Sequence, residues 1–164
     1  MNKFFLIGMP GSGKSTMAKY ISSISDLNYK DLDDEIEKKE GRTINEIFQI
    51  ENENYFRNKE SQILNDIILK ENKFILATGG GTPCFNNNIR LINKSGISIF
   101  LNTSIDKIIE RVKRKDKRPL FYKKNIEELV KNMLNNRIKF YSMSTYSVEN
   151  NNREEVLSII NSNS

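Results

Sequence analysis

Residues 8–15 of the chain, GMPGSGKS, have the pattern of a phosphate-binding loop. They follow the apolar run at residues 4–7 and precede residues 16–21, which have helical character. This context is required before the pattern counts as evidence, because the glycines let successive N–H groups turn toward phosphate oxygens at a helix start. An ordinary glycine turn would give no role to the Lys-Ser pair that ends the pattern. The segment therefore predicts binding of a nucleoside triphosphate.

Individual residues of this loop have distinct expected roles. We expect Lys14 to reach the β- and γ-phosphates and the Ser15 hydroxyl to hold a magnesium ion. Backbone N–H groups elsewhere in the loop and at the start of the helix would bind the remaining phosphate oxygens. The residues expected to bind the nucleotide are Gly11, Ser12, Gly13, Lys14, Ser15 and Thr16.

The length and charge of the chain limit the classes of protein to consider. Its 164 residues suit one domain, and we expect a single domain over residues 1–164. The net charge of +5 can indicate a nucleic-acid partner. However, no basic stripe is interleaved with aromatic residues, and a phosphate-binding cleft itself needs cations. We therefore expect small-molecule substrates and no nucleic acid.

Several features favour a cytoplasmic protein. No apolar stretch approaches the roughly 20 residues that cross a bilayer, so we expect no membrane segment. The first expected strand begins within a few residues of Met1, so we also expect no signal peptide. Cys84 is the single cysteine, and the chain has no histidine, which excludes an internal disulfide and histidine catalysis. The chain has no apolar heptad pattern, and we expect a monomer.

Short apolar runs alternate with longer amphipathic segments, a pattern typical of an α/β fold with a parallel sheet. Thr103 or Ser104 can cap the helix that follows the fourth strand. Gly41 is expected to end the first long helical region, and Gly96 to mark the turn into a strand. The expected strands are Lys3–Ile7, Asn28–Leu32, Phe74–Thr78, Ile97–Leu101 and, more weakly, Tyr146–Val148, and the expected helices start near Lys14, Asp34, Ile44, Asn52, Asn87, Ser104, Ile126 and Arg153.

Two acidic residues end the second expected strand. In extended chain Asp31 and Asp33 would project to one face, at the carboxyl edge where parallel sheets bind ligands. One carboxylate can order magnesium-bound water while the other contacts an acceptor hydroxyl. The alternative is that Asp33 or Asp34 caps the next helix. The third expected strand ends without an acid, in Gly79-Gly80-Gly81, and close approach of a ligand to backbone N–H groups would explain this triplet better than a flexible strand exit.

Taken together, these segments resemble shikimate kinases, in the nucleoside-monophosphate-kinase-like branch of phosphate-loop proteins. The resemblance runs from Lys3 to about Val148, with the motifs in the family's order. It implies a three-layer sandwich with a five-stranded parallel sheet, the P-loop nucleoside triphosphate hydrolase fold. It also implies ATP-dependent phosphorylation of the shikimate 3-hydroxyl, in the chorismate pathway to aromatic amino acids. Besides the phosphate loop, the matching motifs are Asp31-Leu32-Asp33, Gly41-Arg42-Thr43-Ile44, Phe56-Arg57-x-x-Glu60, Thr78-Gly79-Gly80-Gly81, Arg118-Pro119-Leu120 and Arg137-x-x-x-Tyr141.

The resemblance also implies roles for the residues of the acceptor site. Arg57 and Arg137 would bind the shikimate carboxylate, since guanidinium groups match it with two hydrogen bonds. Gly79 and Gly80 would offer backbone N–H groups nearby. Asp33 would take the acceptor hydroxyls. We further expect Glu60 to orient Arg57.

At the nucleotide side, the resemblance implies a lid over residues 112–124 that carries Arg118. Lys14, Asp33 and Arg118 are the expected catalytic residues, and Arg111 is expected to stack on adenine. Magnesium would be held by Ser15 and, through water, by Asp31. Residues 149–153 fall where the family has an adenine-contacting loop, and no single residue there is assigned.

For single residues, the alternative to a role in the site is a purely structural one. Arg57 could form a solvated helix salt bridge with Glu60, and Arg137 could be an exposed cation on a helix. Cys84 is expected to be a bystander thiol. For the whole chain, the alternatives are another small-molecule kinase, such as a gluconate kinase, and a non-catalytic nucleotide-binding regulator.

Overall fold

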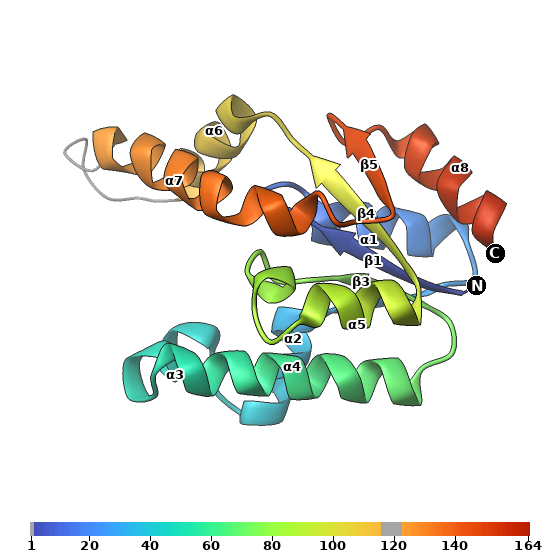
Figure 1. The fold of residues 1–164 in the computed structure, drawn as a ribbon, viewed down its shortest axis with the longest axis horizontal. Helices are drawn as coiled ribbons and strands as arrows, with labels where there is room; N and C mark the ends of the chain where they lie inside the picture. Colours follow the sequence, from blue (N-terminus) through green and yellow to red (C-terminus); the bar gives the residue numbers. More distant parts are fainter. Residues whose placement is uncertain (1, 116–122) are drawn as a thin grey trace.

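Five parallel strands form one sheet in the computed structural model, which describes residues 2–115 and 123–164. The order across the sheet is β2-β3-β1-β4-β5. Figure 1 labels β3, β1, β4 and β5 of this order. The strands confirm the predicted parallel sheet. Their bounds are β1 Lys3–Ile7, β2 Asn28–Asp31, β3 Phe74–Ala77, β4 Ile97–Asn102 and β5 Tyr146–Glu149.

Helices cover both faces of this sheet, which gives three layers (Figure 1). One face packs against α1 and α8 through a core that includes Met17, Ile21 and Val156. The core on the other face includes residues of the remaining α-helices, among them α4 and α7. The helix bounds are α1 Lys14–Ile24, α2 Leu32–Glu40, α3 Ile44–Ile50, α4 Glu53–Lys70, α5 Asn88–Ser95, α6 Ile105–Lys115, α7 Lys123–Tyr141 and α8 Arg153–Asn163, with a 3₁₀-helix η1 at Thr82–Cys84.

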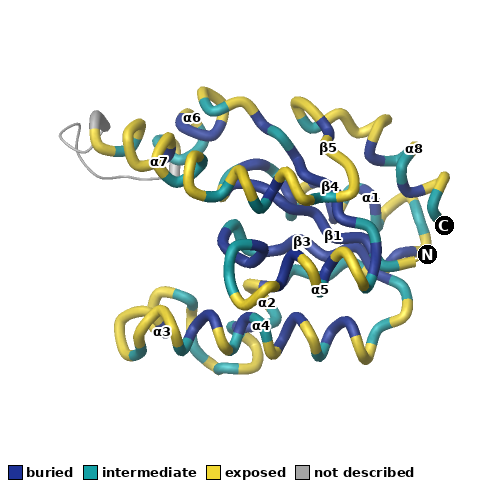
Figure 2. The backbone as a smooth tube through the Cα atoms, viewed as in Figure 1, coloured by how far each residue is buried: buried dark blue, intermediate teal, exposed yellow. Residues whose placement is uncertain are grey.

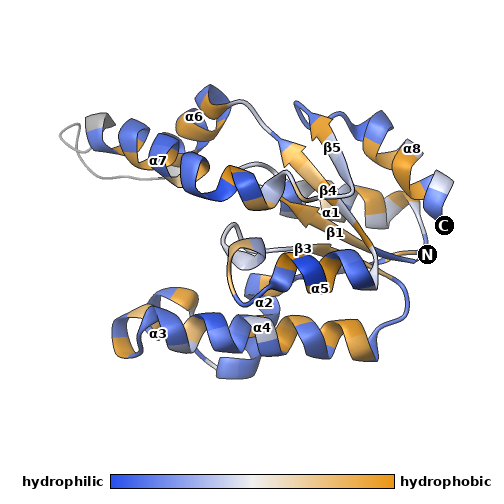
Figure 3. Ribbon diagram, in the orientation of Figure 1, coloured by the Kyte–Doolittle hydropathy of each residue, from blue (hydrophilic) through white to orange (hydrophobic). Residues whose placement is uncertain are grey.

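The central strands are buried on both sides, which explains their continuous apolar sequences. Phe4–Ile7 of β1 and Phe74–Ala77 of β3 are buried along their whole length. The edge strands β2 and β5 are mostly half-buried or exposed, and their residues are more polar. In Figure 2, β1 is mostly dark blue whereas β5 is largely yellow and teal, and Figure 3 shows the hydrophobic character of β1 in orange. The apolar core of the protein therefore lies around the central strands of the sheet.

The strand register brings three loops to one edge of the sheet. Leu6 of β1 pairs with Ala77 of β3, and Ala77 pairs with Asp31 of β2. Because these strands are parallel and end at the same level, the segments that follow them lie side by side. Those segments are the phosphate loop, the start of α2 and the glycine triplet.

One boundary differs from the sequence-based expectation in a way that affects the site. β2 ends at Asp31, and α2 begins at Leu32 rather than near Asp34. The reason is that the Asp31 carboxylate accepts a hydrogen bond from the Asp33 N–H, 3.1 Å away, and so caps the helix early. Asp33 therefore lies in the first helical turn, and the predicted extended geometry of Asp31 and Asp33 is wrong.

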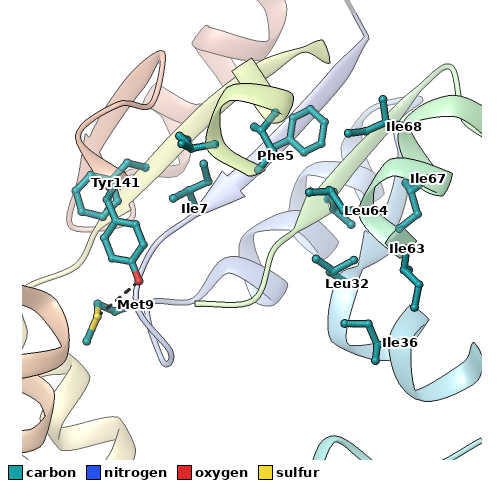
Figure 4. Close-up of a cluster of buried hydrophobic side chains, with 14 of the residues drawn as sticks. Phe5, Ile7, Met9, Leu32, Ile36, Ile63, Leu64, Ile67, Ile68 and Tyr141 are labelled. Carbon is teal, nitrogen blue, oxygen red and sulfur yellow. Dashed lines mark hydrogen bonds between the residues drawn. The ribbon is translucent and has the colours of Figure 1, made fainter. Parts of the chain in front are cut away.

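The end of α7 is anchored against the carboxyl edge of the sheet. Tyr141 is fully buried, and its ring packs on Phe100 with 5.2 Å between ring centroids. Its hydroxyl donates to the Gly80 carbonyl at 2.6 Å. The same hydroxyl approaches the Met9 sulfur at 3.8 Å, as the dashed line in Figure 4 shows. Tyr141 thereby connects α7 with both the glycine triplet and the phosphate loop.

The expected lid lies largely outside the described residues, and so does Arg118 with its Arg-Pro-Leu motif. α6 ends at Lys115 before this segment, and α7 begins at Lys123 after it, three residues earlier than expected. Across the described part of the chain, no helix combines the length and apolar character needed to cross a membrane.

Candidate active site

The phosphate loop is wound tightly between β1 and α1. Gly11 and Gly13 have φ angles of 78° and 92°, which favour glycine, and Gly13 caps the start of α1. Lys14 is buried and folds back over the loop, where its Nζ donates to the Gly8 carbonyl at 2.9 Å and the Met9 carbonyl at 2.8 Å. Burial lowers the pKa of Lys14 to about 8, although the nearby Asp33 and Asp31 charges oppose this shift. The ammonium group is thus already placed at the loop.

Ser15 and Asp31 form a cluster of hard oxygen atoms beside Lys14. The Ser15 hydroxyl donates to Asp31 Oδ2 at 2.5 Å, and the Tyr29 hydroxyl donates to the same oxygen at 3.3 Å. Such oxygens suit Mg²⁺, which usually takes one or two protein ligands and completes its shell with phosphate oxygens and water. No group of three acidic, histidine or cysteine side chains that could hold a metal is found among the described residues. The residues present fit a magnesium ion shared with a nucleotide.

Asp33 lies on the same side of the cleft, one residue into α2. It is exposed to solvent in a concave pocket, so protein atoms surround a carboxylate that a ligand can still reach. Partial desolvation raises its pKa to about 6, the negative charges of Asp31 and Glu60 add to the shift, and Lys14 opposes it. This is a carboxylate poised between its two protonation states near neutral pH.

A pocket of about 830 Å³ joins these elements. It brings together most of the residues expected at the nucleotide and the acidic pair, but Arg57 and Arg137 are not among its lining residues. The lining residues are Pro10, Gly11, Gly13, Lys14, Ser15, Thr16, Met17, Asp31, Asp33, Thr78, Gly79, Gly80, Arg111, Arg114, Asn151 and Arg153.

The two arginines nevertheless lie against the glycine triplet. A Cβ atom added to Gly80 would lie 3.0 Å from Arg137 Nη1 and 2.6 Å from Pro10 Cδ. A Cβ atom added to Gly81 would lie 2.5 Å from Arg57 Nη2. A side chain at either position would displace a guanidinium group or the phosphate loop. Close packing by these groups therefore accounts for the glycines.

Arg57 is buried, and its partners come from its own helix α4 and from the segment after η1. Its Nη1 donates to Glu60 Oε2 at 2.9 Å, and Glu60 Oε1 accepts from the Thr82 hydroxyl at 2.6 Å. Its guanidinium also lies 4.2 Å from the centroid of the Phe85 ring and 5.0 Å from that of Phe56. The interpretation of Arg57 as a solvated helix salt bridge is wrong, since Glu60 is completely buried.

Arg111 lies beside the phosphate loop. It extends from α6, and its Nη1 donates to the Gly11 carbonyl at 2.7 Å. Its expected stacking on adenine stays a prediction.

Cys84 is half-buried at the end of η1, and burial raises the pKa of its thiol. A thiol with a raised pKa is a poor nucleophile at neutral pH, in keeping with the bystander interpretation.

Sequence reasoning missed several residues around the site. Thr82 and Phe85 were given no role, although Thr82 directly follows the glycine triplet, and Tyr141 was only the end of a matching motif. Asn151 lies in the stretch 149–153 that was expected near adenine, but no residue of that stretch was assigned a contact. Thr103 had been considered as a helix cap, but its hydroxyl donates to the Ser12 carbonyl at 2.9 Å. These contacts cross large sequence separations, so no local pattern shows them.

The phosphate loop, the parallel strand order and the acidic pair define a nucleotide-binding protein with the P-loop fold. The shikimate kinase family model matches residues 10–162, and the chain belongs to the shikimate kinase family. The chain is 42% identical to a shikimate kinase of Clostridium botulinum strain 657 over 159 residues, which are 96% of this chain and 92% of that protein. It is 38% identical over 149 residues to a shikimate kinase of Azobacteroides pseudotrichonymphae, a match that covers 88% of each chain.

Solved structures agree with this assignment. The crystal structure of shikimate kinase from Aquifex aeolicus is 31% identical, with a TM-score of 0.80 over 98% of this chain and 95% of the other. Shikimate kinase from Acinetobacter baumannii in complex with shikimate is 30% identical, with a TM-score of 0.88 over 99% of this chain and 94% of the other. The predicted three-layer fold and the family resemblance are both confirmed.

Proposed function

We propose that this chain transfers the γ-phosphoryl group of ATP to the 3-hydroxyl of shikimate, giving shikimate 3-phosphate and ADP. The observation that carries this proposal is the convergence on the glycine triplet. A Cβ atom added to Gly80 would meet both Arg137 and the phosphate-loop residue Pro10, and one added to Gly81 would meet Arg57, so all three side chains lie close to the triplet. A carboxylated acceptor bound there would lie next to the phosphates. The family membership supports the same activity.

In the acceptor site, Arg57 and Arg137 bind the carboxylate of the substrate. Arg57 suits this role because Glu60 and the Phe85 ring fix its guanidinium plane beside Gly81. Gly79 and Gly80 supply backbone N–H groups. Asp33 binds the reacting hydroxyl, because its carboxylate faces the pocket that also contains Lys14.

Transfer depends on positioning and on neutralising the charge of the phosphates, because the transition state is loose. Lys14 moves from its carbonyl partners to the phosphate oxygens, and Gly11, Ser12, Gly13 and Thr16 bind the phosphates with the loop backbone. Asp33 aligns the hydroxyl and accepts its proton, as its raised pKa allows.

Magnesium completes the nucleotide site. Ser15 would hold the ion and Asp31 would hold it through water, since the short hydrogen bond between their side chains places both sets of oxygen atoms at one point. When bound, the ion neutralises charge on the β- and γ-phosphates. Arg111 stacks on adenine. Arg118, on the lid of residues 112–124, adds positive charge during transfer and helps to exclude water.

We further propose that the protein acts in the cytoplasm as a monomer on small-molecule substrates, without a nucleic-acid or membrane partner. The single cysteine and the ordinary composition support this setting.

A coupled assay that measures ADP formation tests the activity. We expect turnover with shikimate, ATP and magnesium, and loss of turnover when EDTA removes the metal. Faster turnover of gluconate or a nucleoside monophosphate than of shikimate would show that shikimate is not the preferred acceptor. ADP binding without turnover of any of these acceptors would favour a regulator. Thermal stabilisation by shikimate, with and without ADP–magnesium, tests acceptor binding separately from catalysis.

A further inference from the structure

The carbonyl group of Ser12, in the middle of the phosphate loop, is held by two side chains from distant parts of the chain. Asn151 Nδ2 donates to it at 2.7 Å, and the Thr103 hydroxyl lies 2.9 Å from it. The same hydroxyl lies 3.0 Å from Asn151 Oδ1, so its single hydrogen can be donated to either of two oxygens at this point, the Ser12 carbonyl or the Asn151 amide. Thr103 follows β4 and Asn151 follows β5, so the carboxyl edges of both strands meet the loop.

This contact fixes the peptide unit between Ser12 and Gly13. In a trans peptide the C=O and the next N–H point in opposite directions. Because Asn151 and Thr103 hold the Ser12 carbonyl, the Gly13 N–H is directed away from them. Gly13 lines the pocket beside Lys14 and caps the start of α1, where phosphate groups bind. The amide of Asn151 therefore sets the direction of an N–H group at the anion site.

The loop that carries Asn151 has a strained and anchored backbone. Asn150 and Asn151 have φ angles of 52° and 55°, a region that few residues other than glycine and asparagine occupy. The Asn150 N–H donates to the Asn102 carbonyl at 3.2 Å, which ties the loop to the end of β4. A Cβ atom added to Gly13 would lie 2.8 Å from Asn151 Nδ2, so the amide packs directly on the phosphate loop. Such strain persists where surrounding contacts maintain it, often at functional sites.

Asn151 and Arg153 line the pocket that also contains Lys14 and Ser15, so one loop reaches two parts of the nucleotide site. We propose that Asn151 is a positioning residue for phosphate binding: its amide holds the Ser12 carbonyl so that the Gly13 N–H faces the phosphates. The inference rests on the nucleotide site of the proposed function, not on the acceptor. It assigns to Asn151 an action through the loop rather than through the adenine base.

Replacement of Asn151 by glycine tests this role without adding backbone strain, because glycine accepts a positive φ. Competition against a fluorescent ADP analogue would give the dissociation constants of ADP, AMP and tripolyphosphate. We expect Asn151→Gly to weaken ADP and tripolyphosphate about tenfold each, the effect of losing roughly one buried hydrogen bond. AMP, which lacks the β-phosphate, should weaken by less than about twofold on the same argument.

Asn150→Gly is the matched control, since Asn150 is exposed and has nearly the same backbone angle. It should leave all three constants unchanged, and both variants should keep the wild-type thermal midpoint within about 2 °C. Thr103→Val, which removes the second hydrogen-bonding group, provides an independent test, and it should also weaken ADP and tripolyphosphate.

Two results would overturn the proposal. Equal weakening of AMP and ADP, with tripolyphosphate unchanged, would mean that Asn151 contacts the base. Unchanged ADP and tripolyphosphate binding in both Asn151→Gly and Thr103→Val would mean that the loop does not depend on this contact. Neither outcome depends on shikimate turnover, so a failure of the proposed function is distinguishable from a failure of this inference.

Discussion

Arg57 and Glu60 form an ion pair in the interior of the protein, with 2.9 Å between Arg57 Nη1 and Glu60 Oε2. Glu60 is 0% exposed and Arg57 is 9% exposed. The second oxygen of Glu60 accepts the Thr82 hydroxyl, so both carboxylate oxygens have a partner. A buried carboxylate with this set of partners fixes the guanidinium group beside the glycine triplet, which is where we propose that the acceptor carboxylate binds.

Glu60→Ala should destabilise the protein and weaken shikimate binding together. Removing one member of a buried ion pair leaves an uncompensated charge, and we expect a loss of about 3 kcal/mol in the free energy of unfolding. The KM for shikimate should rise at least tenfold by this estimate, because Arg57 loses its orientation. Urea unfolding and initial-rate kinetics would measure these effects.

Glu53 provides the matched control for that experiment. It also contacts Arg57, 3.3 Å from its Nε, but its side chain is 59% exposed. Glu53→Ala should change stability by less than about 0.5 kcal/mol, since exposed ion pairs contribute little. Equal effects of the two substitutions would contradict a special role for the buried partner.

Gly81→Ala should displace Arg57 from the acceptor site. The new Cβ would lie 2.5 Å from Arg57 Nη2, so the guanidinium must move. We expect the KM for shikimate to rise about tenfold, with the KM for ATP unchanged. Gly41→Ala is the control, because a Cβ at Gly41 meets no heavy atom within 4 Å and costs about 1 kcal/mol through its positive φ. An unchanged KM for shikimate in Gly81→Ala would argue against this position of Arg57 in the acceptor complex.

Catalysis should require ionised Asp33. Its pKa is raised to about 6, so kcat/KM for shikimate should fall as the pH falls through about 6. Asp33→Asn should abolish transfer and leave the dissociation constant of ADP largely unchanged. A kcat/KM that stays constant from about one pH unit below this pKa of about 6 to about one unit above it would contradict the role of Asp33. Unchanged turnover in Asp33→Asn would do the same.

The same carboxylate should affect stability with a definite sign. Since its folded-state pKa is raised above the usual 3.8, protonated Asp33 favours the folded state, and this contribution is lost as the pH rises through about 6. Asp33→Asn should therefore be slightly more stable than the wild type at pH 7, by less than about 1 kcal/mol because the site is open to solvent. Thermal unfolding of both proteins between pH 4 and pH 7 would measure this. The stability of Asp33→Asn relative to the wild type should grow as the pH rises from 3.8 through about 6.

Nucleotide binding should depend on the charge of Lys14. Burial lowers its pKa to about 8, so ADP affinity should decrease as the pH rises above about 8, when the ammonium group loses its proton. Lys14→Met should bind ADP weakly without this pH dependence and should lower kcat at least about 100-fold. Calorimetric titration of ADP at several pH values would measure the effect. A constant ADP affinity up to pH 9 or above, well past that pKa, would contradict the prediction.

Local patterns were sufficient to predict the order of the structural elements. β1 and the start of α1 were predicted at their observed bounds, because a buried apolar run, three glycines and a Lys-Ser pair impose strand, turn and helix in sequence. Gly41 ends α2 with a φ of 64°, as expected from its place after a helical pattern. The prediction for Asp33 was less accurate, because an extended strand and a capped helix give the same two acidic residues different geometries.

The sequence by itself determined the parallel α/β fold and the phosphate loop, because neighbouring residues encode them, and the motifs that resemble those of shikimate kinases indicated the family. The tertiary structure alone decided which distant side chains complete the site. Thr82 becomes a partner of Glu60, which pairs with Arg57 within α4, and Asn151 becomes a partner of Ser12, only after tertiary packing brings α4 and the carboxyl ends of the strands together. Hydrogen bonds across 22 and 139 residues depend on that packing, which local propensity does not specify.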